Sequence, residues 1–197
     1  MPATSRRAHA PPEERRAQIL EAALQCFAER GYHATKMDDL VAASGLSKGS
    51  LYWHFRSKQD VFLALFDAFV ERFFADWDSA LAVDEPTLEL LRRVAEVGIE
   101  NLGSQRPLLQ AWAEFFTHPA ARERFALIYR RSRAKLVDVF ERGIARGELR
   151  ELPVDSMAST LIGVLEGLYL QAMVDPGFDP RPHWPTAWAI VERGLAR

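Results

Sequence analysis

The residues with the clearest chemical potential lie between positions 47 and 58. On a helical wheel of 100° per residue, Leu51 and Phe55 share one face, and Gly49 and Trp53 lie opposite them. A large aromatic side chain turned away from a core needs a partner that covers it, and a glycine one turn earlier lets another backbone come close. Such a face suits a DNA recognition helix, in which small and hydroxyl groups enter the major groove and aromatic edges touch thymine methyls or deoxyribose.

The neighbouring residues fit the same chemistry. Ser50 and Tyr52 flank the Gly49–Trp53 face, and Lys48 and Lys58 are candidate phosphate neutralisers. The helix starts expected at Thr35 and Ser57 can point backbone N–H groups at phosphates. A structural alternative stays open at this point, because a Tyr-Trp pair at helical spacing also suits a core and hydroxyl residues before helices also serve as plain caps.

Catalytic and metal-binding patterns are not found in the sequence. No two histidines have the i, i+4 spacing of a helical metal pair. Cys26, the single cysteine, excludes an intrachain disulfide framework and a cysteine-based zinc site. We also find no phosphate-cradling glycine-rich loop and no nucleophile elbow. His118, before Pro119, fits a helix end better than a catalytic role. We therefore expect no enzyme, no cofactor and no metal. The histidines are His9, His33, His54, His118 and His183.

The elements that must position these residues are all predicted to be helices. Apolar residues recur at helical spacing between glycines and prolines, and no alternation of period two indicates a sheet. The run Thr35-x-x-Asp38, residue Ser47 and the run Ser57-x-x-Asp60 mark three helix starts, and Gly45 lies in the turn of a helix-turn-helix. We predict about nine helices, at residues 13–30, 35–44, 47–55, 57–82, 86–103, 107–118, 119–146, 155–174 and 185–195.

Charge and hydropathy set weaker limits. The net charge of the chain is −2, but residues 1–60 hold nine Lys/Arg against seven Asp/Glu, and residues 61–197 hold sixteen against twenty. This mild asymmetry fits a local DNA-contacting surface. No run of eighteen apolar residues predicts a transmembrane helix, and no apolar region follows the first residues as in a signal peptide. A reducing cytoplasm is the expected location.

The run TKMDDLVAASGLSKGSLYWHFRSKQD, residues 35–60, closely resembles the DNA-binding motif of the tetracycline-repressor (TetR) family. The resemblance covers about residues 13–66. It implies a helix-turn-helix domain over 13–60 and an effector-binding and dimerisation domain over 61–197. Residues 1–12, with Pro2, Pro11 and Pro12, are expected to form a flexible arm. The LYWH run matches the founding tetracycline repressor, whereas the three residues before Ser50 differ from it, which leaves the operator sequence open. The resemblance implies phosphate contacts from Thr35 and Lys58, and base and backbone contacts from Ser47, Lys48, Gly49, Ser50, Tyr52, Trp53 and His54.

The C-terminal helices predict a dimer. The helix over 155–174 is broadly apolar and has Gly163 and Gly167 one turn apart, so that another helix can approach closely. We expect two such helices per chain to pair with a second copy in a four-helix interface, as the resemblance also implies. The alternative is that these helices fill a larger monomeric core. The candidate interface residues are Leu161, Val164, Leu165, Leu168, Trp184 and Trp188.

The same body supplies candidates for an effector site. They are aromatic, apolar or acidic residues on helices that would surround a cavity: Phe73, Phe74, Trp77, Trp112, Glu114, Phe115, Phe116, Tyr129, Tyr169 and Met173. Each is also a candidate for plain core. Glu114 and Glu166 lie within apolar helical runs, where each could face a cationic ligand, extend to solvent or pair with an arginine.

The sequence therefore predicts a homodimeric regulator that binds a palindromic operator through the helix at 47–55. We expect a repressor that a small, largely apolar or aromatic effector releases by tilting the helix at 57–82. An activator or corepressor-dependent regulator of the same fold is the alternative. A helical enzyme or ligand-binding domain with a vestigial motif is a third possibility, against which the intact Lys48, Tyr52 and Lys58 argue.

Overall fold

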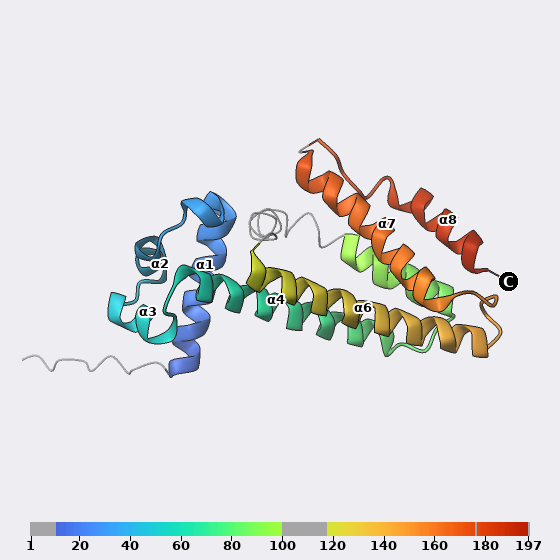
Figure 1. The fold of residues 1–197 in the computed structure, drawn as a ribbon, viewed down its shortest axis with the longest axis horizontal. Helices are drawn as coiled ribbons and strands as arrows, with labels where there is room; N and C mark the ends of the chain where they lie inside the picture. The colour runs from blue at the N-terminus through green and yellow to red at the C-terminus, as the bar shows by residue number, and fades with distance from the viewer. Residues whose placement is uncertain (1–10, 100–117, 176, 197) are drawn as a thin grey trace, which may run out of the picture. The chain divides into compact units, whose positions relative to one another are not determined.

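The computed structural model of the chain describes residues 11–99, 118–175 and 177–196 (Figure 1). Helices dominate, and the one β interaction in the described ranges is an isolated bridge between Leu149 and Ala196. The all-α prediction is confirmed, and the helix expected at 107–118 lies outside the described residues. The helices are α1 (Pro12–Ala34), α2 (Met37–Ser44), α3 (Lys48–His54), α4 (Lys58–Leu81), a helical stretch over 87–99, α6 (Pro119–Ala145), α7 (Val154–Val174) and α8 (Trp184–Leu195).

The chain divides into two compact units, one ending at Ala68 and the other beginning at Phe69. In the first unit, α1, α2, α3 and the first turns of α4 enclose a small core in which Phe27 and Phe62 meet edge to face with ring centroids 5.1 Å apart. Helices of seven or eight residues are marginal alone, so α2 and α3 depend on this packing. Gly45, at φ 66°, closes α2 in the left-handed region that favours glycine, and starts the turn to α3.

The start of α2 differs from its prediction. We expected Thr35 to cap it with Asp38, but the cap is Lys36, whose backbone N–H donates to Oδ2 of Asp39 at 2.7 Å. The hydroxyl of Thr35 is fully buried and donates instead to the backbone oxygens of Gly31 and Cys26, at 2.8 and 3.2 Å. The cause is the end of α1, which continues past a kink at Gly31 (φ 76°) to Ala34 and brings its carbonyl groups to Thr35.

The second unit has its own core, formed by the 87–99 stretch, α6, α7 and α8. Figure 1 shows α6 and α7 side by side. The carboxylate of Glu148, after α6, accepts hydrogen bonds from the backbone N and the Oγ1 of Thr87, at 2.7 and 2.5 Å. These two bonds cap the 87–99 stretch and lower the pKa of Glu148. Gly143 leaves room for the contact, since a Cβ there would lie 2.8 Å from Thr87 and Leu149.

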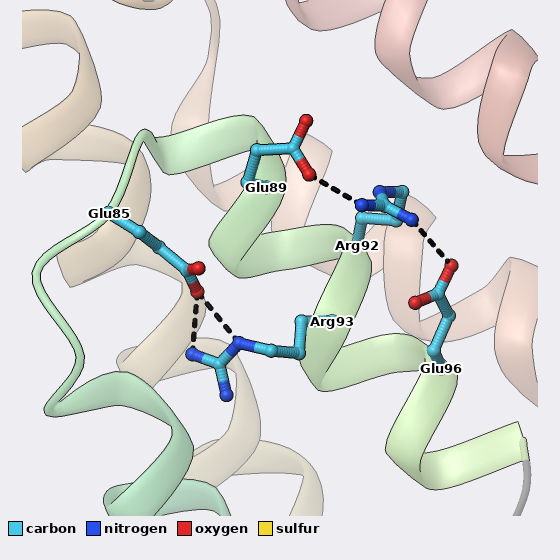
Figure 2. Close-up of polar contacts among 5 residues, drawn as sticks. All are labelled: Glu85, Glu89, Arg92, Arg93 and Glu96. Carbon is cyan, nitrogen blue, oxygen red and sulfur yellow. Dashed lines mark hydrogen bonds and ion pairs between the residues drawn. The ribbon is translucent and has the colours of Figure 1, made fainter.

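Two arginines of the same helical stretch form ion pairs with glutamates (Figure 2). Arg93 binds Oε1 of Glu85 through Nε and a terminal nitrogen, at 2.8 and 2.6 Å, and donates to the carbonyl oxygen of Ala80 in α4 at 2.6 Å. The geometry ties the end of α4 to the 87–99 stretch. Arg92 pairs with Glu89 and Glu96 on its own helix, where exposed ion pairs contribute little to stability.

The second half of α4 is held to α6 by charged and aromatic groups. Phe74 is fully buried, and the guanidinium carbon of Arg131 lies 3.9 Å from its ring centroid. Arg131 also pairs with Glu71 at 3.4 Å, and Lys135 pairs with Asp78. Cation–π contacts of this kind contribute about 0.5–2 kcal/mol, so α4 and α6 are firmly joined within the second unit.

The helix α7 is unusually apolar for a helix with so much exposed surface. It is the one helix among the described residues that is long and apolar enough, by length and composition, to cross a membrane. Core helices of soluble proteins meet the same criterion, although they are mostly buried. Only 22% of the apolar window of α7 is buried in the protomer, so much of its apolar surface is exposed.

Candidate nucleic-acid interface

The helix α3 is anchored to the first unit by one face. Its N-cap is Ser47, whose Oγ accepts a hydrogen bond from the backbone N–H of Ser50 at 3.2 Å. Leu51 is fully buried, and Phe55, which ends the helix, is 5% exposed. Both point into the bundle, as the wheel predicts, so the orientation of α3 is set by these two apolar contacts.

The opposite face of α3 is open. Trp53 is 72% exposed and Tyr52 is 43% exposed, which rules out a core role for the pair in the protomer. A Cβ added to Gly49 would meet nothing within 4 Å. The indole of Trp53 stands edge to face against the ring of His54, with centroids 4.5 Å apart, so its direction is partly fixed.

A groove of about 430 Å³ runs along this open face. Its walls combine the start of α1 with small, hydroxyl and aromatic residues of the α3 segment. Sequence reasoning missed the α1 wall because it lies more than thirty residues earlier in the chain and only the folded unit brings it to α3. The lining residues are Pro12, Arg15, Ser47, Gly49, Ser50, Trp53 and His54.

Lys48, at the start of α3, is exposed but already paired. Its Nζ lies 2.8 Å from Oδ1 of Asp38, and this hydrogen bond raises the pKa of Lys48 above its usual value. Lys36, the N-cap of α2, is also exposed. The sequence assigned Asp38 to the capping of α2, and the pattern gave no signal for its contact with Lys48.

Thr35 and Lys58 lie differently from the α3 residues. Nζ of Lys58 donates to the backbone oxygens of Tyr32, Thr35 and His33, at 2.6, 2.7 and 3.2 Å. Nζ also lies 4.4 Å from the ring centroid of Tyr32. A lysine at these carbonyl groups complements the negative end of the α1 dipole. Together with the buried Thr35, Lys58 fixes the end of α1, so both side chains are engaged inside the unit.

The expected start of α4 is confirmed. Oγ of Ser57 accepts from the N–H of Asp60 at 3.1 Å, and Oδ2 of Asp60 accepts from the N–H of Arg56 at 3.1 Å. The reciprocal bonds satisfy two N–H groups that the helix leaves free.

Some of the effector candidates in the second unit can be placed. Four others lie outside the described residues: Trp112, Glu114, Phe115 and Phe116. Phe74 is covered by Arg131, and the rings of Phe73 and Trp77 are 5.5 Å apart. The indole Nε1 of Trp77 is buried and has no hydrogen-bond partner in the described part of the chain.

The remaining candidates bring hydroxyl and carboxyl groups into the unit. Burial and then a hydrogen bond with Glu166 raise the pKa of Tyr129 well above its usual value. Burial alone raises the pKa of Tyr169, whose hydroxyl would lie 2.7 Å from a Cβ added to Gly98. Met173 is half-buried. The carboxylate of Glu166 therefore hydrogen-bonds with Tyr129, a partner that the sequence did not predict for it.

The interface candidates are also divided. Leu161, Trp184 and Trp188 are at most 6% exposed and belong to the core of their own protomer. Leu165 and Leu168 are half-buried against that core, and Val164 is half-buried. The exposed apolar side chains lie elsewhere on α7 and α8: Leu170 at 58%, Val174 at 76% and Ile190 at 70%.

A helix-turn-helix unit with an open face on α3, joined to a helical body, is the arrangement of a DNA-binding regulator. Residues 19–65 match the family described as bacterial regulatory proteins, tetR family, and residues 89–197 match the BetI-type transcriptional repressor C-terminal family. The second match covers more than half of the chain. The chain therefore belongs to the TetR family of transcriptional regulators, as the motif at residues 35–60 implied.

Individual relatives agree with this assignment. The transcriptional repressor KstR2 of Mycobacterium tuberculosis is 32% identical over 145 residues, which are 72% of each chain. The transcriptional activator FasR of Mycolicibacterium smegmatis is 38% identical over 86 residues, 44% of this chain and 39% of that protein. A transcriptional regulator of Saccharomonospora viridis, solved in complex with choline, superposes with a TM-score of 0.82 at 25% identity and covers 94% of this chain and 99% of its own.

Proposed function

We propose that this regulator is a homodimeric repressor that binds a palindromic operator through α3 and is released by a small effector bound in the second unit. The observation that carries the proposal is the open face of α3, where Gly49 and the 72% exposed Trp53 stand opposite the buried Leu51. A soluble helix leaves an indole this exposed at low cost only where a partner covers it in the functional complex. The cations Arg15 and Lys48 beside it favour nucleic acid as that partner.

The proposed contacts follow from the placement of the side chains. Gly49 and Ser50, in the first turn of α3, meet base edges in the major groove. Tyr52, Trp53 and His54 meet base methyls and deoxyribose. The remaining residues act at the phosphate backbone or through the position of α3: Lys48, Lys36 and Arg15 contact phosphates, Ser47 caps α3, and Thr35 and Lys58 hold the end of α1.

This assignment is tested by genomic fragment selection followed by binding measurements on the selected operator. The Tyr52→Ala and Trp53→Ala variants should bind the operator more weakly than the wild type. Leu127→Ala, which removes an exposed side chain from α6, is the matched control and should bind normally. Normal binding by both folded α3 variants would refute the interface.

The dimer is proposed to form through the outward faces of α7 and α8. Added Cβ atoms at Gly163 and Gly167 would meet nothing within 4 Å, so packing inside the protomer does not require glycine at either position. The exposed Leu170, Val174 and Ile190 extend the same apolar surface. A second copy of α7 and α8 would cover it and form a four-helix interface. Two recognition helices would then read half-sites about 34–36 Å apart.

For the effector, we propose a small, largely apolar or aromatic molecule, supported by the aromatic cluster of Phe73, Phe74 and Trp77. A cationic effector is a second candidate, favoured by the half-buried Glu166 beside Tyr129 and by the choline bound to the Saccharomonospora viridis regulator. Thermal-shift measurements with choline, a fatty acid and a neutral aromatic compound distinguish these. A cation should raise the melting temperature of the wild type and not of Glu166→Gln, whereas a neutral effector should stabilise both.

To release the regulator from its operator, the effector needs only to bind the non-binding state more tightly than the DNA-binding state. Such a difference in binding free energy is typically about 1–3 kcal/mol. The helix α4 is shared by both units and is the covalent path for such a change.

The activator alternative is supported by the relative FasR. The position of the selected operator decides between repressor and activator. An operator that overlaps the promoter indicates repression, and an operator upstream of the promoter indicates activation.

A further inference from the structure

We propose that Asp38 competes with DNA phosphates for Lys48 and so limits how tightly this regulator holds any DNA, operator or not. The proposal rests on the assignment of α3 as the DNA-binding helix. It adds an acidic residue of α2 to the interface, with a role opposite in sign to that of the basic residues.

The ion pair joins the two helices of the helix-turn-helix. Asp38 is the second residue of α2 and Lys48 is the first of α3. Oδ1 of Asp38 and Nζ of Lys48 are 2.8 Å apart, and the two side chains are 74% and 63% exposed. The pair therefore lies at the surface, beside the Ser47 and Gly49 that line the α3 groove.

The neighbouring carboxylate shows that Asp38 is not needed for the cap of α2. Asp39 accepts the backbone N–H of Lys36 at 2.7 Å and binds the guanidinium of Arg30 at 3.0 Å. Asp39 thus closes the start of the helix and ties it to α1. Asp38 directs its carboxylate at a lysine on the DNA-binding side, so its charge acts there.

A carboxylate and a phosphate oxygen compete for the same N–H donors of an ammonium group. When Lys48 turns to a phosphate, the pair with Asp38 breaks, and a negative charge remains next to the DNA backbone. An exposed pair of this kind accounts for about a 1.5- to fivefold change in an equilibrium constant. In a dimer the factor applies twice, so the total is about two- to 25-fold.

The competition acts on the part of the affinity that is independent of base sequence. Phosphate contacts supply nearly all of the non-specific binding of such proteins, and a free Lys48 would strengthen binding at every genomic site. Asp38 reduces this retention, while base contacts from the α3 face still select the operator.

The test uses the full-length Asp38→Asn variant, which keeps the side-chain shape and removes the charge. We expect it to bind both the selected operator and a non-operator duplex of equal length about two- to 25-fold more tightly than the wild type. The slope of log K against log salt should steepen, because Lys48 then contacts the phosphate without a neighbouring carboxylate that offsets its charge. Unchanged or weaker binding, with the same melting temperature, would overturn the proposal. The weaker outcome would mean that the pair positions α3.

Two further variants make the result specific. In a Lys48→Ala background, Asp38→Asn should gain less than it does in the wild type, because the competition acts through Lys48 and only the direct repulsion between Asp38 and the phosphates remains. An undiminished gain in that background would contradict the proposal. Glu21→Gln, on the exposed side of α1, is the charge-matched control and should bind as the wild type does.

The binding measurements distinguish a failure of this proposal from a failure of the proposed function. If α3 is not the DNA-binding helix, Tyr52→Ala and Lys48→Ala will leave operator affinity unchanged. If only the role of Asp38 is mistaken, those two variants will bind weakly and Asp38→Asn will fail to bind more tightly.

Discussion

The outward faces of α3 and α7 share one unusual feature and differ in everything around it. Each has a glycine above which a Cβ would meet nothing within 4 Å, and each exposes large apolar side chains nearby. On α3 the exposed groups are the aromatic Tyr52 and Trp53, next to hydroxyls and Lys48. On α7 they are the aliphatic Leu170 and Val174.

The difference indicates what covers each face. Aromatic rings beside cations and hydroxyl groups suit a polyanion with stacked bases and methyl groups. Aliphatic side chains beside small residues suit another helix at close range. On a helix face that also exposes apolar side chains, an open glycine favours close approach by a partner, and the groups around the glycine favour one kind of partner over another.

The largest predicted effect comes from filling the α7 face. Gly167→Trp should turn the dimer into a monomer, because the indole occupies the space that the second helix needs. Operator affinity should fall on the order of 10³-fold, since the two half-sites are no longer read together. Sedimentation and operator titration measure the two effects. Leu127→Trp, an exposed substitution on α6, is the control and should remain dimeric.

Truncating the exposed indole on the α3 face should have no such effect on assembly. Trp53→Ala should cost about 1–2 kcal/mol per half-site, roughly five- to 30-fold, through lost contacts to DNA. It should leave the dimer and the melting temperature unchanged, because the indole is 72% exposed in the protomer. A large fall in the melting temperature of this variant would mean that Trp53 packs within the fold.

Lys48 and Lys58 should have different roles in the first unit, because Lys48 lies at the surface and Lys58 is bonded to backbone oxygens of the fold. Lys58→Ala removes three bonds to backbone oxygens and should lower stability by about 1 kcal/mol. Lys48→Ala should leave stability nearly unchanged and reduce the salt slope by about 0.9 per half-site. Thermal unfolding and salt titrations check both. If instead Lys58→Ala reduced the salt slope and Lys48→Ala lowered stability, Lys58 and not Lys48 would be the residue that contacts phosphate.

The smallest predicted effects come from adding one methyl group to each open glycine. Gly49→Ala and Gly167→Ala should each stabilise the protomer by up to about 1 kcal/mol, because alanine has the higher helix propensity and the space is open. Gly49→Ala should weaken operator binding and leave dimerisation unchanged. Gly167→Ala should weaken dimerisation, and operator affinity should fall only as far as the dimer dissociates. Weaker dimerisation in Gly49→Ala would mean that the two faces are not independent.

The sequence predicted those features that depend on local period and chain order. The opposition of Leu51 and Trp53 follows from 3.6 residues per turn, and the reciprocal cap of Ser57 and Asp60 follows from their spacing. The motif at residues 35–60 identified the family. The cap expected at Thr35 failed because the spacing rule does not register the kink at Gly31, which turns the hydroxyl inward.

Long-range features needed the fold. An apolar stripe predicts that Leu161 and Trp188 are covered, but it does not say whether their own protomer or a second copy covers them. The pair of Asp38 and Lys48 depends on the turn at Gly45, and the approach of Arg15 to α3 depends on the packing of α1. These positions are set by tertiary contacts, which single-sequence patterns do not contain.

The central claim is that α3 faces DNA and α7 faces a second copy. Sedimentation of the Trp53→Ala variant with a labelled operator duplex tests both parts at once. We predict that the variant sediments as a dimer and leaves the duplex unbound at concentrations where the wild type binds it fully. A dimer that carries the duplex as the wild type does, or a variant that sediments as a monomer, would contradict the claim.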